Sequence, residues 1–253
     1  MQTRFRTVAA LVCGVITMGA GSLLAQKPKS QKEVQAIQAV QAAQTPDDRI
    51  KAIENVLTNF ADTEFKNVLL QMAMQAEEQK GDYTQTVFYA QRLLQSDPKS
   101  AVALVTLATE TAGHTREFDL DKDDKLAKVD KWAKDGIEAA KGITAPRYPE
   151  ESKDLQAQGY EALGLAAILR KKYDDAANDF KQSVALATGP DAARYYVRLG
   201  RAYEDGGKFD EATDAFDKAA NTPNVLPQVK SAAEQGKQDV AKRKSGGAAP
   251  AKP

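Results

Sequence analysis

The stretch ARYYVRLGRAYEDGGKFDEATDAFDKA, residues 193–219, decides the fold of this chain. Apolar and small residues recur three and four positions apart on both sides of a Gly-Gly-Lys turn, as they do along the buried faces of two helices joined by a short connection. Gly200 and Ala212 are small, which lets the two helices cross closely. Tyr203 and Phe216 are large enough to fill the gap to neighbouring units. The stretch therefore predicts a helix–turn–helix unit that packs against others like it.

The same unit recurs along the chain. Residues 157–183 reproduce the spacing of 193–219 with identical offsets, 36 positions earlier. Weaker copies begin at Glu33, Asn67 and Ala101, which are 34 positions apart. Such a period is typical of repeat proteins in which each two-helix unit shares its core with its neighbours. We therefore predict units at 33–66, 67–100, 101–146, 150–190 and 193–226, closed by a capping helix at 227–243.

Two of the copies depart from the pattern. The copy at 67–100 carries Met74 where a small residue is expected, which predicts a looser crossing of its two helices. In the copy at 101–146, the sequence GHTREFDLDKDD at 113–124 replaces the short turn, so we predict an inserted loop there. After the capping helix, residues 244–253 are small, basic and rich in Pro and Gly, which predicts a disordered tail.

The copy at 193–226 carries the residues of a known repeat in the same order: Tyr196, Leu199, Gly200, Tyr203, Ala212 and Phe216. This order resembles the tetratricopeptide repeat, a helix–turn–helix of 34 residues with the pattern Trp-x2-Leu-Gly-x2-Tyr followed by Ala-x3-Phe. Tyr196 stands where that repeat has Trp. The resemblance implies an all-α fold, a right-handed α-solenoid of helix–turn–helix repeats, and a protein that binds proteins or peptides.

In the proteins that this chain resembles, the first helices of successive repeats line a concave groove, and the second, fifth, ninth and twelfth places of each repeat face a bound peptide. Carrying those places over predicts the following groove residues: Gln71, Gln75, Glu78, Val105, Glu161, Leu165, Ile168, Arg194, Val197, Arg201 and Glu204. Arg194 and Arg201 share one helix face, where they would hold a carboxylate or an acidic peptide. The alternative is that both are solvated and pair with Glu204 or Asp205.

The three aliphatic candidates also have two interpretations. Val105, Leu165 and Ile168 either line the groove or pack against neighbouring helices, because aliphatic residues at helical spacing are usually core residues.

The charge of the chain argues against a nucleic-acid partner. Lys and Arg number 35, as do Asp and Glu. Without residues 1–25, which include Arg4 and Arg6, the totals are 33 and 35, a net charge of −2. A chain without a basic excess has no long-range field that attracts phosphates.

The N-terminal segment predicts export. Arg4 and Arg6 precede an uncharged run of 18 residues, 8–25, which a polar, Lys-bearing segment follows. This is the layout of a secretory signal peptide, with cleavage expected after Ala25. The alternative is a retained membrane anchor. Both interpretations place the rest of the chain outside the cytoplasm, in the periplasm or secreted, and the only cysteine, Cys13, would leave with the signal peptide.

The sequence contains no group of residues that predicts catalysis or a cofactor. Asp119, Asp121 and Asp123 alternate as in a calcium loop, but Asp124 stands where such loops require Gly, and the twelfth position is Asp130 rather than Glu. His114 is the sole histidine, and the Gly-rich loops that bind phosphates are missing from the sequence. We therefore expect a protein that is not an enzyme and has no metal or cofactor.

Two functional hypotheses follow. In the first, the protein is an adaptor of the cell envelope that holds a peptide or a partner domain in its groove. In the second, it is a structural subunit of an envelope or outer-membrane assembly complex, in which the convex face and the tail matter more than the groove. A membrane contact is expected only if the N-terminal segment stays uncleaved.

Overall fold

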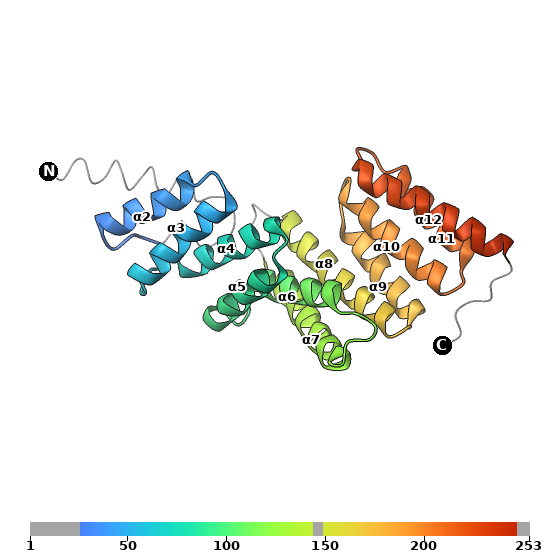
Figure 1. The fold of residues 1–253 in the computed structure, drawn as a ribbon, viewed down its shortest axis with the longest axis horizontal. Coiled ribbons are helices and arrows are strands. Elements are labelled where there is room, and N and C mark those ends of the chain that lie inside the picture. Colours follow the sequence, from blue (N-terminus) through green and yellow to red (C-terminus); the bar gives the residue numbers. More distant parts are fainter. Residues whose placement is uncertain (1–25, 144–148, 247–253) are drawn as a thin grey trace. The chain divides into compact units, whose positions relative to one another are not determined.

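The computed structural model describes residues 26–143 and 149–246, and this part of the chain is all-helical (Figure 1). The predicted all-α fold is therefore confirmed. The helices follow one another in pairs, and the pairs are α2 (Gln31–Ala42) with α3 (Pro46–Asn59), α4 (Lys66–Lys80) with α5 (Tyr83–Ser96), α6 (Ala101–His114) with α7 (Lys122–Lys141), α8 (Pro149–Leu169) with α9 (Tyr173–Leu186), and α10 (Asp191–Asp205) with α11 (Phe209–Ala220). The last helix is α12 (Pro227–Ser245).

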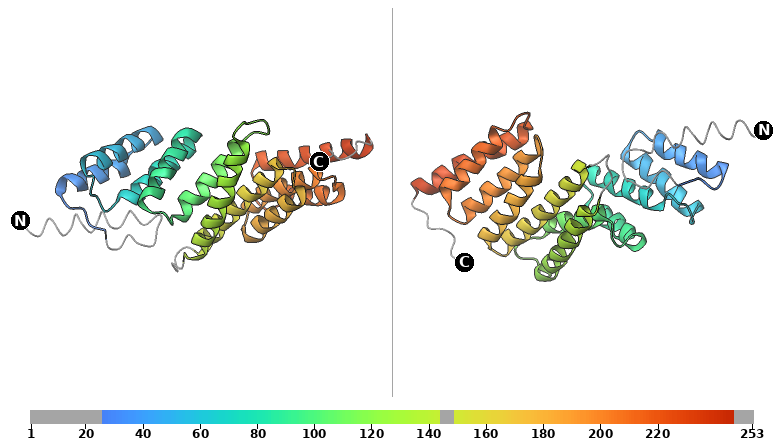
Figure 2. Two further views of the ribbon diagram at one scale, coloured as in Figure 1. Left: turned by 90° about the horizontal axis from the view of Figure 1, so that it is seen from below. Right: turned by 180° about the vertical axis from the view of Figure 1, so that it is seen from behind.

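The chain divides into two compact units, of which the first ends at Ala103 and the second begins at Leu104. In the first unit, α3 packs against both α2 and α4, and α4 packs against α5. In the second unit, successive helices from α7 to α12 lie side by side, and α12 also contacts α10 (Figure 2). Within each unit, these helices therefore bury their apolar faces mainly against their neighbours in sequence, as expected for stacked two-helix repeats.

Local signals set the ends of the helices in the first unit. The side chains of Ser30, Thr45 and Asp82 each accept a hydrogen bond from a backbone N–H in the first turn of the helix that follows. Gly81 ends α4 in the left-handed conformation, with φ of 71°, and its N–H bonds to carbonyl oxygens of the last turn. A glycine adopts this conformation without the steric penalty that a Cβ would bring.

The second repeat exchanges a large and a small residue between its helices. Met74 on α4 and Ala90 on α5 are both fully buried. They occupy the places that Gly200 and Phe216 hold in the last repeat, so the bulky side chain has moved from the second helix to the first. This exchange keeps the interior filled, and Met74 therefore does not by itself indicate a looser crossing.

Glycine–phenylalanine contacts join the helices of the second unit. A Cβ on Gly164 would lie 2.7 Å from the ring of Phe180, and a Cβ on Gly200 would lie 2.6 Å from the ring of Phe216. The Phe216 ring also lies against Gly236 of α12. Phe216 therefore fills space within its own repeat as well as the gap to the next helix, and only glycine fits beside the ring.

The connection between α6 and α7 is shorter than the inserted loop predicted over 113–124. Helix α6 continues through His114 and α7 begins at Lys122, so only residues 115–121 lie outside the helices. The additional residues lengthen α7 to 20 residues. Asp123 and Asp124 fall in the first turn of α7, where negative charge interacts favourably with the helix dipole.

Two predictions concern the ends of the chain, the signal peptide and the disordered tail. The predicted signal peptide, 1–25, lies outside the described residues, as do residues 247–253 of the predicted tail. Helix α12 extends to Ser245, so Lys244 and Ser245 belong to the helix and not to the predicted tail. Within the described residues, the helices are too short or too polar to cross a membrane.

Candidate functional site

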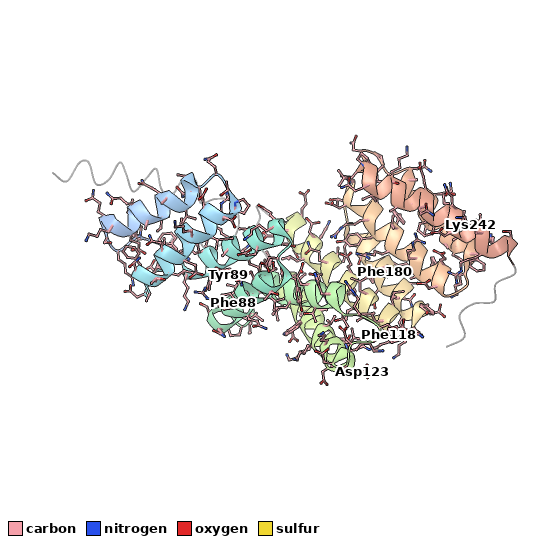
Figure 3. All side chains as sticks on the ribbon, in the orientation of Figure 1. Phe88, Tyr89, Phe118, Asp123, Phe180 and Lys242 are labelled. Carbon is pink, nitrogen blue, oxygen red and sulfur yellow. The ribbon has the colours of Figure 1, made fainter. Side chains whose placement is uncertain are left out.

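A cavity of about 380 Å³ opens in the second unit between α8, α10 and α12. We call it the arginine groove, and it is lined by Leu165, Ile168, Phe180, Arg194, Val197, Arg198, Arg201, Asp205, Gln228, Val229 and Ala232. Phe180 comes from α9 and is labelled in Figure 3. The floor of the groove is aliphatic and aromatic, and three of its four charged lining residues are arginines.

The structure brings five of the predicted groove residues together in this cavity: Leu165, Ile168, Arg194, Val197 and Arg201. They lie on α8 and α10, the first helices of the two most regular repeats. Leu165 and Ile168 also pack against buried core residues of the second unit. Both interpretations of these two side chains therefore hold, because each is half-buried in the core and half-exposed to the groove.

Glu161 pairs with two of the three arginines that line the groove. Its two carboxylate oxygens are 3.1 Å from Nη1 of Arg194 and 3.3 Å from Nε of Arg198, so one buried acid pairs with two bases. Arg194 also donates a hydrogen bond to the hydroxyl of Tyr195 and lies over its ring, 4.3 Å from the centroid. These contacts hold the Arg194 guanidinium in one place, whereas the Nη groups of Arg198 have no partner among the described residues.

Glu204 pairs with the third arginine that lines the groove. Nη1 of Arg201 is 2.7 Å from an oxygen of Glu204 and 3.1 Å from an oxygen of Asp239 on α12. Arg243, also on α12, lies 3.4 Å from the other oxygen of Glu204 and 3.6 Å from Asp205. The alternative prediction from the sequence is that Arg194 and Arg201 pair with Glu204 or Asp205. Arg201 does pair with Glu204, whereas Arg194 pairs with Glu161.

Two predicted groove residues are therefore counter-ions rather than wall residues. Glu161 and Glu204 are only 6% and 4% exposed, and neither lines the cavity. A carboxylate buried in this way must be paired, and the arginines of the neighbouring helices supply the partners. The prediction that these two side chains face a peptide needs this correction.

Burial also shifts the pKa values of two side chains at or beside the groove, Asp205 and Tyr195. Burial and the nearby charge of Glu204 raise the pKa of Asp205, the one acidic lining residue. The pKa of the Tyr195 hydroxyl is likewise raised, chiefly by burial, so the hydroxyl stays protonated. Since Glu161 and Glu204 are buried beneath the arginines that they pair with, the groove exposes mainly guanidinium groups above an apolar floor. This arrangement suits a ligand with both acidic and apolar groups.

The remaining candidates lie outside the arginine groove. Val105 is fully buried, and its Cγ2 would be 2.8 Å from a Cβ placed on Gly136 of α7. It is therefore a packing residue, as the alternative interpretation proposed. Gln71 is half-buried, and Gln75 and Glu78 are exposed; all three belong to α4 in the first unit.

Several groove residues were not predicted from the sequence. Arg198 occupies the sixth place of its repeat, whereas the resemblance assigned the second, fifth, ninth and twelfth places to the groove. Gln228, Val229 and Ala232 belong to α12, which was interpreted only as a cap. A usable signal was present for one of them, because Gln228 follows Arg194 by 34 positions and so holds the same place in the next repeat.

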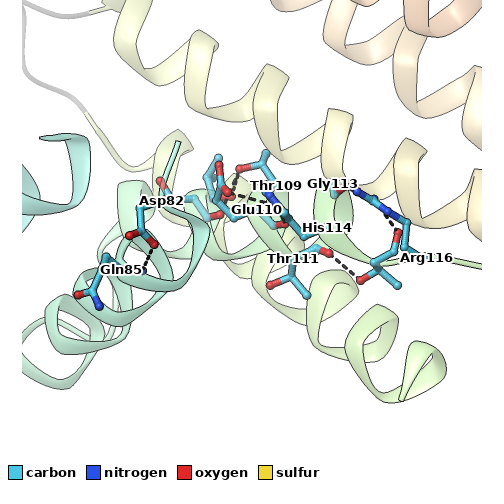
Figure 4. A network of polar contacts seen from close by, with 11 residues as sticks. Asp82, Gln85, Thr109, Glu110, Thr111, Gly113, His114 and Arg116 are labelled. Carbon is cyan, nitrogen blue, oxygen red and sulfur yellow. Dashed lines mark hydrogen bonds and ion pairs between the residues drawn. The ribbon is translucent and has the colours of Figure 1, made fainter. Parts of the chain in front are cut away.

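The residues weighed for metal binding or catalysis make ordinary structural contacts. Nδ1 of His114 lies 2.9 Å from the carbonyl oxygen of Glu110 (Figure 4). Asp119 accepts hydrogen bonds from the N–H of Arg116 at 3.1 Å and from Lys125 at 3.0 Å. Within the part of the chain that the structure describes, acidic, His and Cys side chains do not gather into a group that could hold a metal ion.

Comparisons with known proteins agree with this architecture. The family model of the tetratricopeptide repeat matches residues 161–225, which run from α8 through α11. A thermophilic TPR protein of Thermus thermophilus has a similar structure, with a TM-score of 0.55, 17% identity, and coverage of 80% of this chain and 95% of its own. The MamA protein is similar, with a TM-score of 0.54, 17% identity, and coverage of 87% and 98%.

No curated protein matches the sequence. At 17% identity the two solved structures show a shared fold and no more. The family match, the paired helices and the spacing of Gly200 and Phe216 agree on the repeat type. Residues 161–225 therefore carry the tetratricopeptide repeat, and the chain has the fold of tetratricopeptide-repeat proteins, an all-helical solenoid.

Proposed function

We propose that this protein is an exported adaptor whose arginine groove binds an acidic and partly apolar segment of a partner protein. The tetratricopeptide fold supports a role as a scaffold for protein–protein interactions, and proteins of this type are generally non-catalytic. The observation that carries the proposal is the pairing of one buried acid, Glu161, with two arginines at the wall of an apolar cavity.

Arg198 is the residue best placed to meet a ligand. Half of its side chain is exposed, and Nε alone is engaged, at 3.3 Å from Glu161. Its two Nη groups can therefore donate hydrogen bonds to a carboxylate without breaking an existing contact. A charge-assisted hydrogen bond of this kind contributes about 1.5–3 kcal/mol.

The apolar floor supplies the second part of the recognition. Leu165, Ile168 and Val197 are half-buried, so each keeps apolar surface that a ligand can cover. Covering such surface contributes about 25 cal/mol per Å². A segment that alternates acidic and apolar side chains would place its carboxylates on the arginines and its apolar groups on the floor.

Fluorescence anisotropy with labelled peptides tests the groove. We expect a peptide of sequence Glu-Phe-Glu-Leu-Glu to bind more tightly than Lys-Phe-Lys-Leu-Lys, and its affinity to fall as salt is raised. Arg198→Ala should weaken binding at least about tenfold, which corresponds to the loss of one charge-assisted contact. Glu161 keeps Arg194 as its partner in this variant, so the fold should persist.

Lys131→Ala is the matched control. Lys131 is highly exposed on α7 and does not line the groove, and Asp135 on the same helix is its one ion-pair partner in the described part of the chain. Its loss should leave peptide affinity unchanged, whereas equal effects of the two substitutions, or equal affinity for the acidic and basic peptides, would reject the groove as the binding site.

The location outside the cytoplasm rests on the N-terminal pattern, in which Arg4 and Arg6 precede an uncharged run of 18 residues. Sequencing the N-terminus of the protein recovered from a periplasmic extract or culture medium should give Gln26 as the first residue. Recovery of the chain only in the cytoplasmic fraction with Met1 intact would contradict export. Full-length chain in the membrane fraction would favour the retained anchor.

A further inference from the structure

The α6–α7 connection exposes two large apolar side chains to solvent. Phe118 is 89% exposed and Leu120 is 107% exposed, the highest values among the exposed large hydrophobic residues of the described chain. Phe118 is labelled on this connection in Figure 3. We call residues 116–121 the apolar tip. Two neighbouring apolar side chains without cover mark a surface that contacts something else.

Polar contacts hold the tip in a defined shape. Arg116 donates from Nη1 to the carbonyl oxygen of Gly113 at 2.7 Å (Figure 4). Between the two apolar residues, Asp119 turns inward and accepts hydrogen bonds from Arg116 and Lys125. Glu117 pairs with Lys171 in the α8–α9 turn at 3.0 Å. The tip is therefore preorganised, which lowers the entropic cost of inserting it into a partner.

The surroundings of the tip are acidic. Residues 116–124 contain five acidic and two basic residues, a formal charge of −3. Asp123 and Asp124 make no ion pair with another described residue. An acidic surface is repelled by anionic lipid headgroups, so the charge favours a protein partner with a basic rim over a membrane surface.

The same unit carries a surface with the complementary properties. The arginine groove has an apolar floor, and the Nη groups of Arg198 at its wall have no partner among the described residues, whereas Arg194 and Arg201 are paired with acids of the same unit. In the described structure Phe118 and Leu120 are exposed, so the tip does not occupy the groove of its own chain. The apolar floor suits Phe118 and Leu120, and, among the described residues, the unpaired Nη groups of Arg198 are complementary to the unpaired carboxylates of Asp123 and Asp124.

We propose that the apolar tip of one copy inserts into the arginine groove of a second copy. This inference rests on the proposed function, because it names the occupant of the same groove. Phe118 or Leu120 enters between α8, α10 and α12, and the carboxylates of Asp123 and Asp124, at the start of α7, meet the Nη groups of Arg198. Since the tip and the groove are different surfaces, the contact is head-to-tail and can propagate from copy to copy.

Sedimentation velocity of the mature chain, from about 1 to about 100 µM, tests the proposal in the range where weak protein contacts lie. We expect assemblies larger than a monomer that dissociate as salt is raised. The tip variant, Phe118→Ser with Leu120→Ser, should be monomeric throughout. It should keep its fold, since both side chains are exposed. The control Phe88→Ser removes an exposed aromatic residue of the first unit and should assemble as the wild type does.

A mixing experiment separates this contact from any other mode of association. The groove variant Arg198→Ala should also be monomeric alone, with a dissociation constant for assembly raised at least about tenfold. Mixed with the tip variant, which keeps an intact groove, it should form a 1:1 complex and nothing larger. Two tip variants mixed together should form none.

Three results would overturn the proposal. The first is wild-type assembly by the tip variant, and the second is absence of the 1:1 complex. The third is monomeric wild-type protein that binds vesicles of phosphatidylcholine through Phe118 and Leu120. If assembly is absent while the acidic peptide still binds with its dependence on Arg198, the proposed function stands and only the second copy is excluded as occupant.

Discussion

Replacing Gly200 with alanine tests the contact that joins the helices of the last repeat. The new Cβ would lie 2.6–2.9 Å from three ring atoms of Phe216. Overpacking of this kind costs about 1–3 kcal/mol. Alanine offsets part of this cost, because it is favoured over glycine in a helix by about 0.5–1 kcal/mol. We therefore expect Gly200→Ala to lower the free energy of unfolding by about 1–2 kcal/mol.

A double-mutant cycle identifies the cause of that loss. Phe216→Ala should cost about 3–5 kcal/mol on its own, since the ring is fully buried. In that background Gly200→Ala no longer meets the ring, and it should stabilise the protein by about 0.5–1 kcal/mol. The sign of the alanine substitution thus reverses, which corresponds to a coupling of about 2 kcal/mol between the two positions.

Urea unfolding followed by circular dichroism at 222 nm measures each variant. Gly113→Ala is the matched control, because a Cβ on Gly113 in α6 meets nothing within 4 Å. It should be neutral or slightly stabilising. If Gly200→Ala is stabilising in the wild-type background, or equally destabilising with and without the Phe216 ring, then the Gly–Phe contact does not limit the approach of the helices.

Further substitutions test other parts of the fold. Asp179→Asn should stabilise the protein by about 1–2 kcal/mol at pH 7.5, because burial and the charge of Asp175 raise the pKa of Asp179 to about 6. The pKa of Asp179 is higher in the folded state than in the unfolded state, so the free-energy cost of its charge grows as the pH rises from 4 to 6. A gain in stability from Asp179→Asn that persists at pH 4 would contradict this cause. Gly81→Ala should lower stability by about 1 kcal/mol in thermal melts, since φ is 71°, and Gly81→Asn should cost less. Thr63→Val should cost about 1–3 kcal/mol in urea unfolding, because it removes the 2.6 Å hydrogen bond to the buried carboxylate of Glu33.

Much of the fold was predictable because its signals are local. The recurrence of small and large residues predicted the helix pairs, and Pro46 and Gly81 lie at helix ends, where such residues are expected. The extent of the α6–α7 loop was less predictable. Nothing in the residues at 113–124 showed that α7 would begin at Lys122, because an acidic first turn and an acidic loop have the same composition.

The groove was predictable only in part. Arg194, Val197 and Arg201 follow from the place of each residue in its repeat, which fixes the helix face it occupies. Glu161 satisfies the same rule, yet it is buried beneath Arg194 and Arg198. The rule describes which side of a helix a residue lies on, whereas burial depends on how closely the next helix approaches.

By itself the sequence determined the helices, their order and the type of repeat, because helix formation and the packing of consecutive helices depend on residues close together in the chain. Only the tertiary structure decided which polar residues line the groove. Arg198 pairs with Glu161 across 37 positions and Arg201 with Asp239 across 38, so the charge left over in the groove depends on contacts between separate helices. Such pairing is set by the geometry of the stack, which no single segment of the sequence contains.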